Sequence, residues 1–118
     1  MLYNSEMKGI KSIHWIGSAK DELLDFPKDA IRSAGYQLHR LQEGKEPLDW
    51  KPLNNLGKGI TSVFEIRIWE DKSTYRIAAV TKTANVVTVL HCWHKKTQTI
   101  AKHNKEIIVT RYKEAKDN

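Results

Sequence analysis

Two arginines occur in neighbouring segments whose alternating pattern is typical of β-strands. Arg67 lies in the middle of residues 63–69, and Arg76 is the third residue of 74–81. A four-residue turn between the two segments predicts a hairpin, which would bring the two guanidinium groups close together on one face. Such cations repel each other unless an anion lies between them, and phosphate matches the guanidinium fork. Glu65, on the same predicted face, supports the alternative that carboxylates neutralise both arginines on a solvated face.

A second group of candidate residues lies in and after residues 86–93, which are apolar almost throughout and predict a central strand covered on both faces. His91 and Trp93 share one face of this strand. An imidazole transfers protons near neutral pH, and an indole stacks on a nucleobase. Lys95 and Lys96 follow at the strand end, where side chains are held beside the sheet. The alternatives are packing for Trp93 and solubility for the lysine pair.

The histidines of this segment do not predict a metal site. His91 and His94 are three residues apart on a strand, so we expect them on opposite faces, and Cys92 is the only cysteine of the chain. Gly57-Lys58-Gly59 is too short for a nucleotide-binding loop. Lys58 is instead interpreted as a flexible basic group at the mouth of the sheet, where it would contact RNA. We expect neither a metal nor a cofactor.

The charge of the chain agrees with an anionic partner. The 118 residues have a formal net charge of +6 and a pI of about 9.5, which favours nucleic acid first and an acidic protein second. The excess is concentrated at the end: residues 95–118 carry 7 basic and 3 acidic side chains, against 13 and 11 in residues 1–94. The alternative is a generally basic surface that keeps the protein soluble.

The same composition excludes several classes of protein. A single cysteine forms no internal disulfide, which indicates a reducing compartment. Residues 1–16 are too polar for a signal peptide, and no stretch is long and apolar enough to span a bilayer. We therefore expect a cytoplasmic protein with no membrane partner.

The elements that must position these residues begin with a short strand at residues 10–16. Ser18 then has the spacing of a capping box and predicts a short helix that ends before Pro27. A second helix follows to about Glu43, with Gly44 as its C-terminal cap. The apolar residues of this helix recur at intervals of three and four and form one stripe. They are Ile31, Ala34, Leu38 and Leu41.

The second half of the chain predicts a sheet and a final helix. Residues 45–59 contain two prolines and two glycines without periodicity and are interpreted as a loop. Three antiparallel strands in a meander follow, and 104–115 predict a helix. The fold class is thus α+β: an N-terminal strand, a helical hairpin, a three-stranded meander and a C-terminal helix, in two layers with the helices on one sheet face. We expect one domain over 1–118, with 1–7 as an N-terminal extension and Met7 as an alternative start.

Three motifs, taken in this order and spacing, resemble the phage-derived HigB branch of the RelE toxin superfamily. Residues 38–44 of the second predicted helix fit the same family, and the resemblance covers roughly residues 8–115. The motifs are Phe64-Glu65-Ile66-Arg67-Ile68, Tyr75-Arg76-Ile77 and Leu90-His91-Cys92-Trp93-His94-Lys95-Lys96-Thr97-Gln98.

The resemblance implies a RelE-like two-layer fold and a ribosome-dependent, metal-independent endoribonuclease. Such a toxin cuts mRNA in the ribosomal A site through attack of the 2′-OH on the phosphate, and a HigA-like helix-turn-helix antitoxin silences it. Arg67 and Arg76 would then stabilise charge on the phosphate. The pair at 95–96 would hold the backbone or assist the leaving oxygen, His91 would transfer protons, and Trp93 would stack on a codon base.

The chain departs from the family pattern at two places. Ala78-Ala79 stands where relatives carry an aromatic residue, and Cys92-Trp93 stands where they commonly carry Gly-Phe. Two alternative functions remain beside the one that the resemblance implies. One is a ParE-type toxin, which has the same scaffold but inhibits DNA gyrase and needs no phosphate-binding face. The other is a basic RNA-binding module without catalytic activity.

Overall fold

The computed structural model describes residues 10–81, 85–95 and 100–117, so the predicted extension 1–7 and Lys96 lie outside it. The predicted α+β class is confirmed, with helices and a five-stranded sheet. No helix of the described residues is long and apolar enough to cross a membrane. The elements in chain order are β1 (Ser12–Trp15), α1 (Ala19–Leu24), α2 (Lys28–Gln42), β2 (Trp50–Pro52), β3 (Val63–Glu70), β4 (Ser73–Val80), β5 (Val86–Lys95) and α3 (Lys102–Asp117).

The sheet has the strand order β1-β5-β4-β3-β2. Strands β3, β4 and β5 form the predicted antiparallel meander, and β1 pairs with β5 in parallel. The prediction of a loop over 45–59 is wrong at β2, which pairs antiparallel with β3 and places Lys51 opposite Glu65. Three residues that include Pro52 carry no periodic signal, so pairing with a neighbouring strand, rather than local pattern, forms this edge strand.

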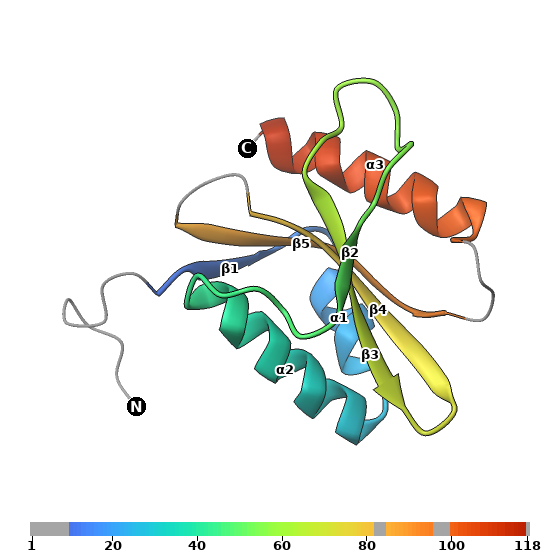
Figure 1. The fold of residues 1–118 in the computed structure, drawn as a ribbon. Coiled ribbons are helices and arrows are strands. Elements are labelled where there is room, and N and C mark those ends of the chain that lie inside the picture. The colour runs from blue at the N-terminus through green and yellow to red at the C-terminus, as the bar shows by residue number, and fades with distance from the viewer. Residues whose placement is uncertain (1–9, 82–84, 96–99, 118) are drawn as a thin grey trace.

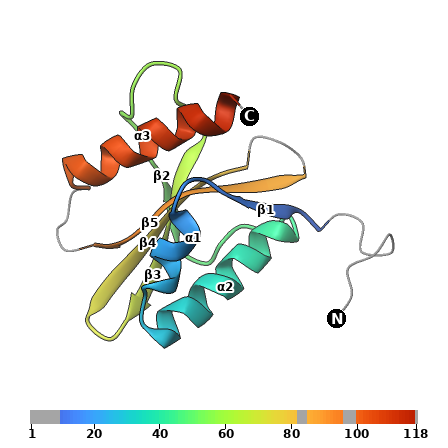
Figure 2. The same ribbon diagram turned by 180° about the vertical axis from the view of Figure 1, so that it is seen from behind.

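The helices lie on both faces of the sheet, as Figures 1 and 2 show from opposite sides. The amphipathic α2 and the short α1 cover one face, where Ala34 and Leu38 pack on Ile66 and Ile77. On the other face, α3 packs through Ile108 and Tyr112. The expectation that all helices cover one face is therefore wrong for α3. The physical reason is that the middle of β5 is apolar on both sides and needs cover on each.

The ends of the first two helices agree only in part with their sequence signals. Gly44 follows α2 with φ +82° and its N–H donates to the carbonyl of Leu41, which confirms the predicted cap. The predicted capping box at Ser18 is wrong. The Ser18 hydroxyl makes no capping hydrogen bond and instead contacts Glu22 Oε2 at 3.2 Å.

A β-bulge in β5 sets the direction of the residues that follow it. Ala78 of β4 is opposite His91, whereas Ala79 is opposite Val89, so Leu90 is the extra residue. Val89 packs in the core under α1 and α2, and Leu90 packs in the core under α3. The bulge therefore lets Leu90 and the buried His91 both lie on the α3 side of β5.

Candidate nucleic-acid interface

The two arginines lie directly opposite each other in the β3–β4 hairpin, as the sequence predicts. Their face also carries Lys51 of the edge strand β2 and Lys95 at the end of β5. We call these four side chains, Lys51, Arg67, Arg76 and Lys95, the cationic face. α3 covers the other end of this sheet face, where it packs near Val63 and Val80. The turn end of the β3–β4 hairpin extends away from α3 (Figure 1), and the arginine pair lies in the middle of this hairpin.

Arg76 is buried and forms an ion pair with a buried carboxylate. Its Nη1 donates to Glu65 Oε2, and Glu65 is 1% exposed. Lys51 Nζ lies 3.9 Å from the same oxygen. Within the described residues, the buried Nε of Arg76 has no hydrogen-bond partner. A buried donor without a partner is costly, so the described residues leave the hydrogen-bonding capacity of Arg76 incompletely satisfied.

Arg67 is partly exposed and is held by a second carboxylate. Its Nε and Nη2 lie 2.8 and 2.6 Å from Asp49 Oδ1. The other oxygen of Asp49 accepts a hydrogen bond of 2.6 Å from the indole N–H of Trp69. Trp69 follows Arg67 by two residues on β3, and it is 62% exposed. An exposed indole therefore lies next to the arginine pair.

The four cations of the face have two described carboxylates among them, Glu65 and Asp49. The surplus of cations over carboxylates contributes to the electrostatics of Lys95. Burial and the nearby Arg76 lower the pKa of Lys95 from its usual range, Glu65 opposes the change, and the other two cations add to it. A cluster in which cations exceed carboxylates has a positive potential that attracts an anion.

His91 and Trp93 lie beside this cluster but under α3. Trp93 is opposite Arg76 in the register of β4 and β5. It is 7% exposed and stacks on the ring of His91, with centroids 5.1 Å apart and an angle of 12°. The expectation that both rings lie on an open face is therefore wrong, because α3 packs over this part of β5. Trp69, rather than Trp93, is the open indole of the face.

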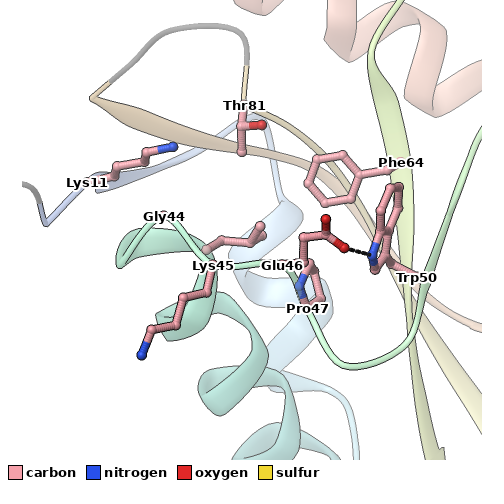
Figure 3. A pocket seen from close by; sticks show the side chains of 9 residues that line it. Lys11, Gly44, Lys45, Glu46, Pro47, Trp50, Phe64 and Thr81 are labelled. Atoms are coloured by element: carbon pink, nitrogen blue, oxygen red, sulfur yellow. Dashed lines mark hydrogen bonds between the residues drawn. The ribbon is translucent and has the colours of Figure 1, made fainter.

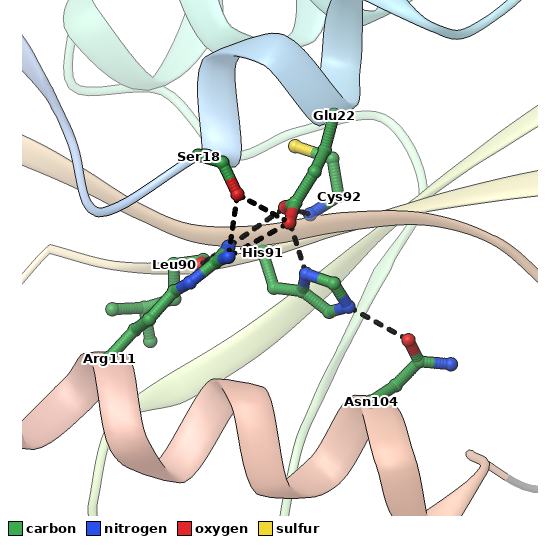
Figure 4. Close-up of polar contacts among 7 residues, drawn as sticks. All are labelled: Ser18, Glu22, Leu90, His91, Cys92, Asn104 and Arg111. Atoms are coloured by element: carbon green, nitrogen blue, oxygen red, sulfur yellow. Dashed lines mark hydrogen bonds and ion pairs between the residues drawn. The ribbon is translucent and has the colours of Figure 1, made fainter.

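The polar groups around the buried His91 form a second cluster, drawn in Figure 4. We call it the β5 junction; it contains Ser18, Glu22, His91, Asn104 and Arg111. Nδ1 of His91 is 2.9 Å from Glu22 Oε1, and its Nε2 is 2.8 Å from Asn104 Oδ1. Both ring nitrogens are therefore engaged within the chain.

The electrostatics of the β5 junction centre on Glu22. Burial alone would raise the pKa of this carboxyl, but hydrogen bonds from His91, Arg111 and the Cys92 N–H hold it well below its usual range. Burial and the charge of Glu22 raise the pKa of the Cys92 thiol, although Arg111 opposes this change. A thiol of this kind is protonated and packs as a core residue.

The other predicted residues lie elsewhere. Lys58 is exposed in the loop between β2 and β3, whose Leu56 and Ile60 pack in the core under α3. The structure therefore does not bring Lys58 to the arginine pair. His94 stacks on Tyr75 at 4.6 Å, on the face opposite His91, as the sequence predicts. The described residues contain no group of three or more metal-ligating side chains placed to hold an ion.

A pocket of about 260 Å³ lies on the α2 side of the sheet, at the end of α2 (Figure 3). Its wall includes Trp50 and Phe64, whose rings meet edge to face at 5.9 Å. The indole N–H of Trp50 donates to Glu46 Oε2 at 3.1 Å. None of the four cations of the cationic face lines this pocket, so it forms no part of the candidate interface.

Four of the charged residues that complete the two clusters were not predicted from the sequence, namely Glu22, Asp49, Lys51 and Arg111. One feature of the sequence does indicate that His91 has polar partners. A histidine within an apolar strand requires hydrogen-bonding partners when it is buried. The sequence does not say which residues supply them, because Glu22 and Asn104 come from different helices.

The chain was compared with protein families. Residues 21–113 match the family described as "Phage derived protein Gp49-like (DUF891)". No curated protein matches the chain significantly. The matched region contains all four residues of the cationic face, and it contains every residue of the β5 junction except Ser18.

Proposed function

The chain belongs to the Gp49-like family of phage-derived proteins, a family of RelE/HigB-type toxins from toxin–antitoxin systems, and we propose that it cleaves mRNA. In this proposal the protein is a ribosome-dependent, metal-independent endoribonuclease that acts in the ribosomal A site. Toxins of this family are generally ribonucleases. The observation that carries the proposal is the arginine pair on β3 and β4, which shares its sheet face with Lys51 and Lys95. Within the described residues, the buried Nε of Arg76 in this pair has no hydrogen-bond partner.

The proposed reaction is an internal transfer of the phosphoryl group. The 2′-oxygen of the ribose forms a bond to the adjacent phosphorus as the bond from phosphorus to the 5′-oxygen breaks. The 2′-hydroxyl loses a proton and the 5′-oxygen gains one, so the products are a 2′,3′-cyclic phosphate and a 5′-hydroxyl end. Negative charge builds up on the phosphate oxygens, and preorganised cations stabilise it.

The cationic face supplies these cations. A guanidinium has five N–H donors, so Arg67 and Arg76 can each contact a phosphate while they keep their carboxylate partners. Lys95, whose pKa is lowered by burial and by Arg76, is suited to proton exchange near the reacting oxygens. Lys96, outside the described residues, and Lys58 are proposed to bind the RNA backbone.

The aromatic residues of the proposed site differ in role. Trp69 is exposed beside Arg67 and is the proposed stacking surface for a base. Trp93 is 7% exposed, and its proposed role is to support the site beside Arg76, its partner in the sheet. His91 belongs to the site through its stacking on Trp93 rather than as an exposed acid or base.

The proposed partners follow from the family. A toxin of a toxin–antitoxin system has an antitoxin partner, and a HigA-like helix-turn-helix protein is proposed for this chain. A ParE-type action on gyrase is the second candidate. The paired arginines favour the first, because a gyrase inhibitor does not need a face that binds phosphate.

The deciding experiment is to induce the chain in bacterial cells and map RNA ends. Cuts in phase with codons, only in translated messages and ending in a 2′,3′-cyclic phosphate, are the expected result. Arg67→Ala should abolish these cuts with the fold intact. Arg32→Ala is the matched control, since Arg32 forms an exposed ion pair with Asp29 at 3.2 Å on α2, away from the cationic face.

Two results would contradict the proposal. Growth arrest with DNA damage and intact messages would indicate the gyrase-inhibiting class. Absence of arrest, with RNA still bound by the purified protein, would indicate a binding module without catalytic activity.

A further inference from the structure

Among the described strands, one edge of β5 is unpaired after Val89. β1 pairs with β5 as far as Val89, whose carbonyl accepts from Ile16 N–H. Beyond this point no described strand pairs with that edge of β5. Unpaired backbone groups at a buried edge are costly. A side chain or another element must therefore satisfy the groups of Leu90 and Cys92.

Two charged side chains occupy the place of the missing strand. Oε1 of Glu22 accepts a hydrogen bond from Cys92 N–H at 3.2 Å, and Nη1 of Arg111 donates to the Leu90 carbonyl at 3.0 Å. The two side chains also bond each other as a fork, at 2.8 and 2.9 Å. Glu22 comes from α1 and Arg111 from α3, so the pair joins both helices to the bulged part of β5 (Figure 4).

The same carboxylate holds His91. The bulge at Leu90 turns His91 toward α3, where Asn104 engages the second ring nitrogen. Contacts at both ring nitrogens thereby fix the orientation of the imidazole, and the ring of Trp93 stacks on it. Trp93 in turn lies opposite Arg76 in the sheet. Side-chain contacts thus run from Glu22 through His91 to Trp93, and strand pairing places Trp93 opposite Arg76 of the cationic face.

We infer that Glu22, Arg111 and Asn104 are positioning residues, which act through His91 to hold Trp93 against the cationic face. His91 is then itself a positioning residue and does not carry the reacting proton. Both of its ring nitrogens bond to the chain, so neither is directed at a substrate. The effect on RNA cleavage rests on the proposed function, whereas the positioning of the two rings does not.

The first test needs no activity. Glu22→Gln keeps an acceptor oxygen and the size of the side chain but removes the charge that bonds Arg111. We expect it to shift the NMR signals of the His91 ring nitrogens and of the Trp93 indole N–H while the far-UV circular dichroism stays that of the wild type. The matched control is Asp21→Asn, which removes a carboxylate from the same turn of α1 at an exposed position. Equal spectra of the two variants at His91 and Trp93 would overturn the inference.

The second test separates positioning from proton transfer. His91→Gln retains a donor and an acceptor, and we expect the cleavage rate on translating ribosomes to fall by about 10- to 100-fold, as for a misplaced site. The shape of the pH–rate profile should not change, since the titrating group is elsewhere. Loss of one limb of the profile would show that His91 transfers the proton and would overturn the assignment.

The two tests distinguish failure of the positioning role from failure of the proposed function. If the wild type does not cleave RNA, the cleavage proposal is wrong, and the NMR comparison still decides whether the β5 junction positions Trp93. If the wild type cleaves RNA but Glu22→Gln leaves both rings unchanged, the positioning role is wrong and the cleavage proposal stands. Should Glu22→Gln fail to fold, Arg111→Lys replaces it, because it keeps the charge on Glu22 but loses the fork.

Discussion

The cationic face and the β5 junction both pair basic side chains with carboxylates, but they balance the two in different ways. In the β5 junction, one carboxylate receives His91, Arg111 and a backbone N–H, all from its own chain. On the cationic face, cations exceed carboxylates and the buried Nε of Arg76 has no described partner. This difference agrees with the proposal that the cationic face binds an external anion, whereas the β5 junction, satisfied within the chain, holds the fold.

The largest expected effect comes from a change that keeps the charge of the cationic face and removes only its geometry. Arg76→Lys retains a cation beside Glu65 but loses the planar fork. We expect cleavage to fall by about 100- to 1000-fold, the cost of removing one preorganised donor in an enzyme site, with little change in melting temperature. Single-turnover cleavage on ribosomes measures the first and calorimetry the second. Wild-type cleavage by this variant would remove Arg76 from the site.

The next largest effect is expected in the stability that the β5 junction gives to the fold. Arg111→Met leaves the Leu90 carbonyl and Glu22 without their charged donor, which should lower the free energy of unfolding by about 1–3 kcal/mol. Urea denaturation measures this loss. Lys113→Met is the control, because Lys113 is exposed on the same helix. Equal stability of the two variants would mean that the junction does not hold the fold.

A smaller effect is expected from the exposed indole of the cationic face. Trp69→Ala should weaken RNA binding by about tenfold, near the lower end of what stacking on one base contributes, and leave the rate at saturating ribosomes nearly unchanged. The matched control is Trp50→Ala, since Trp50 also donates to a carboxylate but lies at the pocket beside α2. An equal loss in both variants would show that the effect is not specific to the cationic face.

The smallest effect concerns acid stability. The pKa of Glu22 in the folded protein lies below its usual value of 4.5, so its stabilising effect is present above that value and is lost as the pH falls below it. Between about pH 5 and pH 2, the stability of the wild type should therefore approach that of Glu22→Gln. Denaturation at a series of pH values measures this difference. A constant difference over the range would contradict the depressed pKa.

Much of the fold follows from local patterns in the sequence. The stripe on α2 and the alternation of β3 depend on residues a few positions apart, and the cap at Gly44 depends on one residue that tolerates positive φ. The edge strand β2 and the bulge at Leu90 were not predicted. Each arises from pairing with another strand, for which three residues or one inserted residue leave no periodic trace.

The sequence by itself determined that Arg67 and Arg76 meet and that His91 and His94 separate. A short turn and a period of two residues fix both facts without reference to the rest of the chain. The tertiary structure alone decided that His91 is buried and held. Its partner Glu22 is 69 positions away, and Glu22 meets Arg111 across 89 positions. Such contacts form only when α1 and α3 pack against the same edge of β5, and no local pattern specifies that packing.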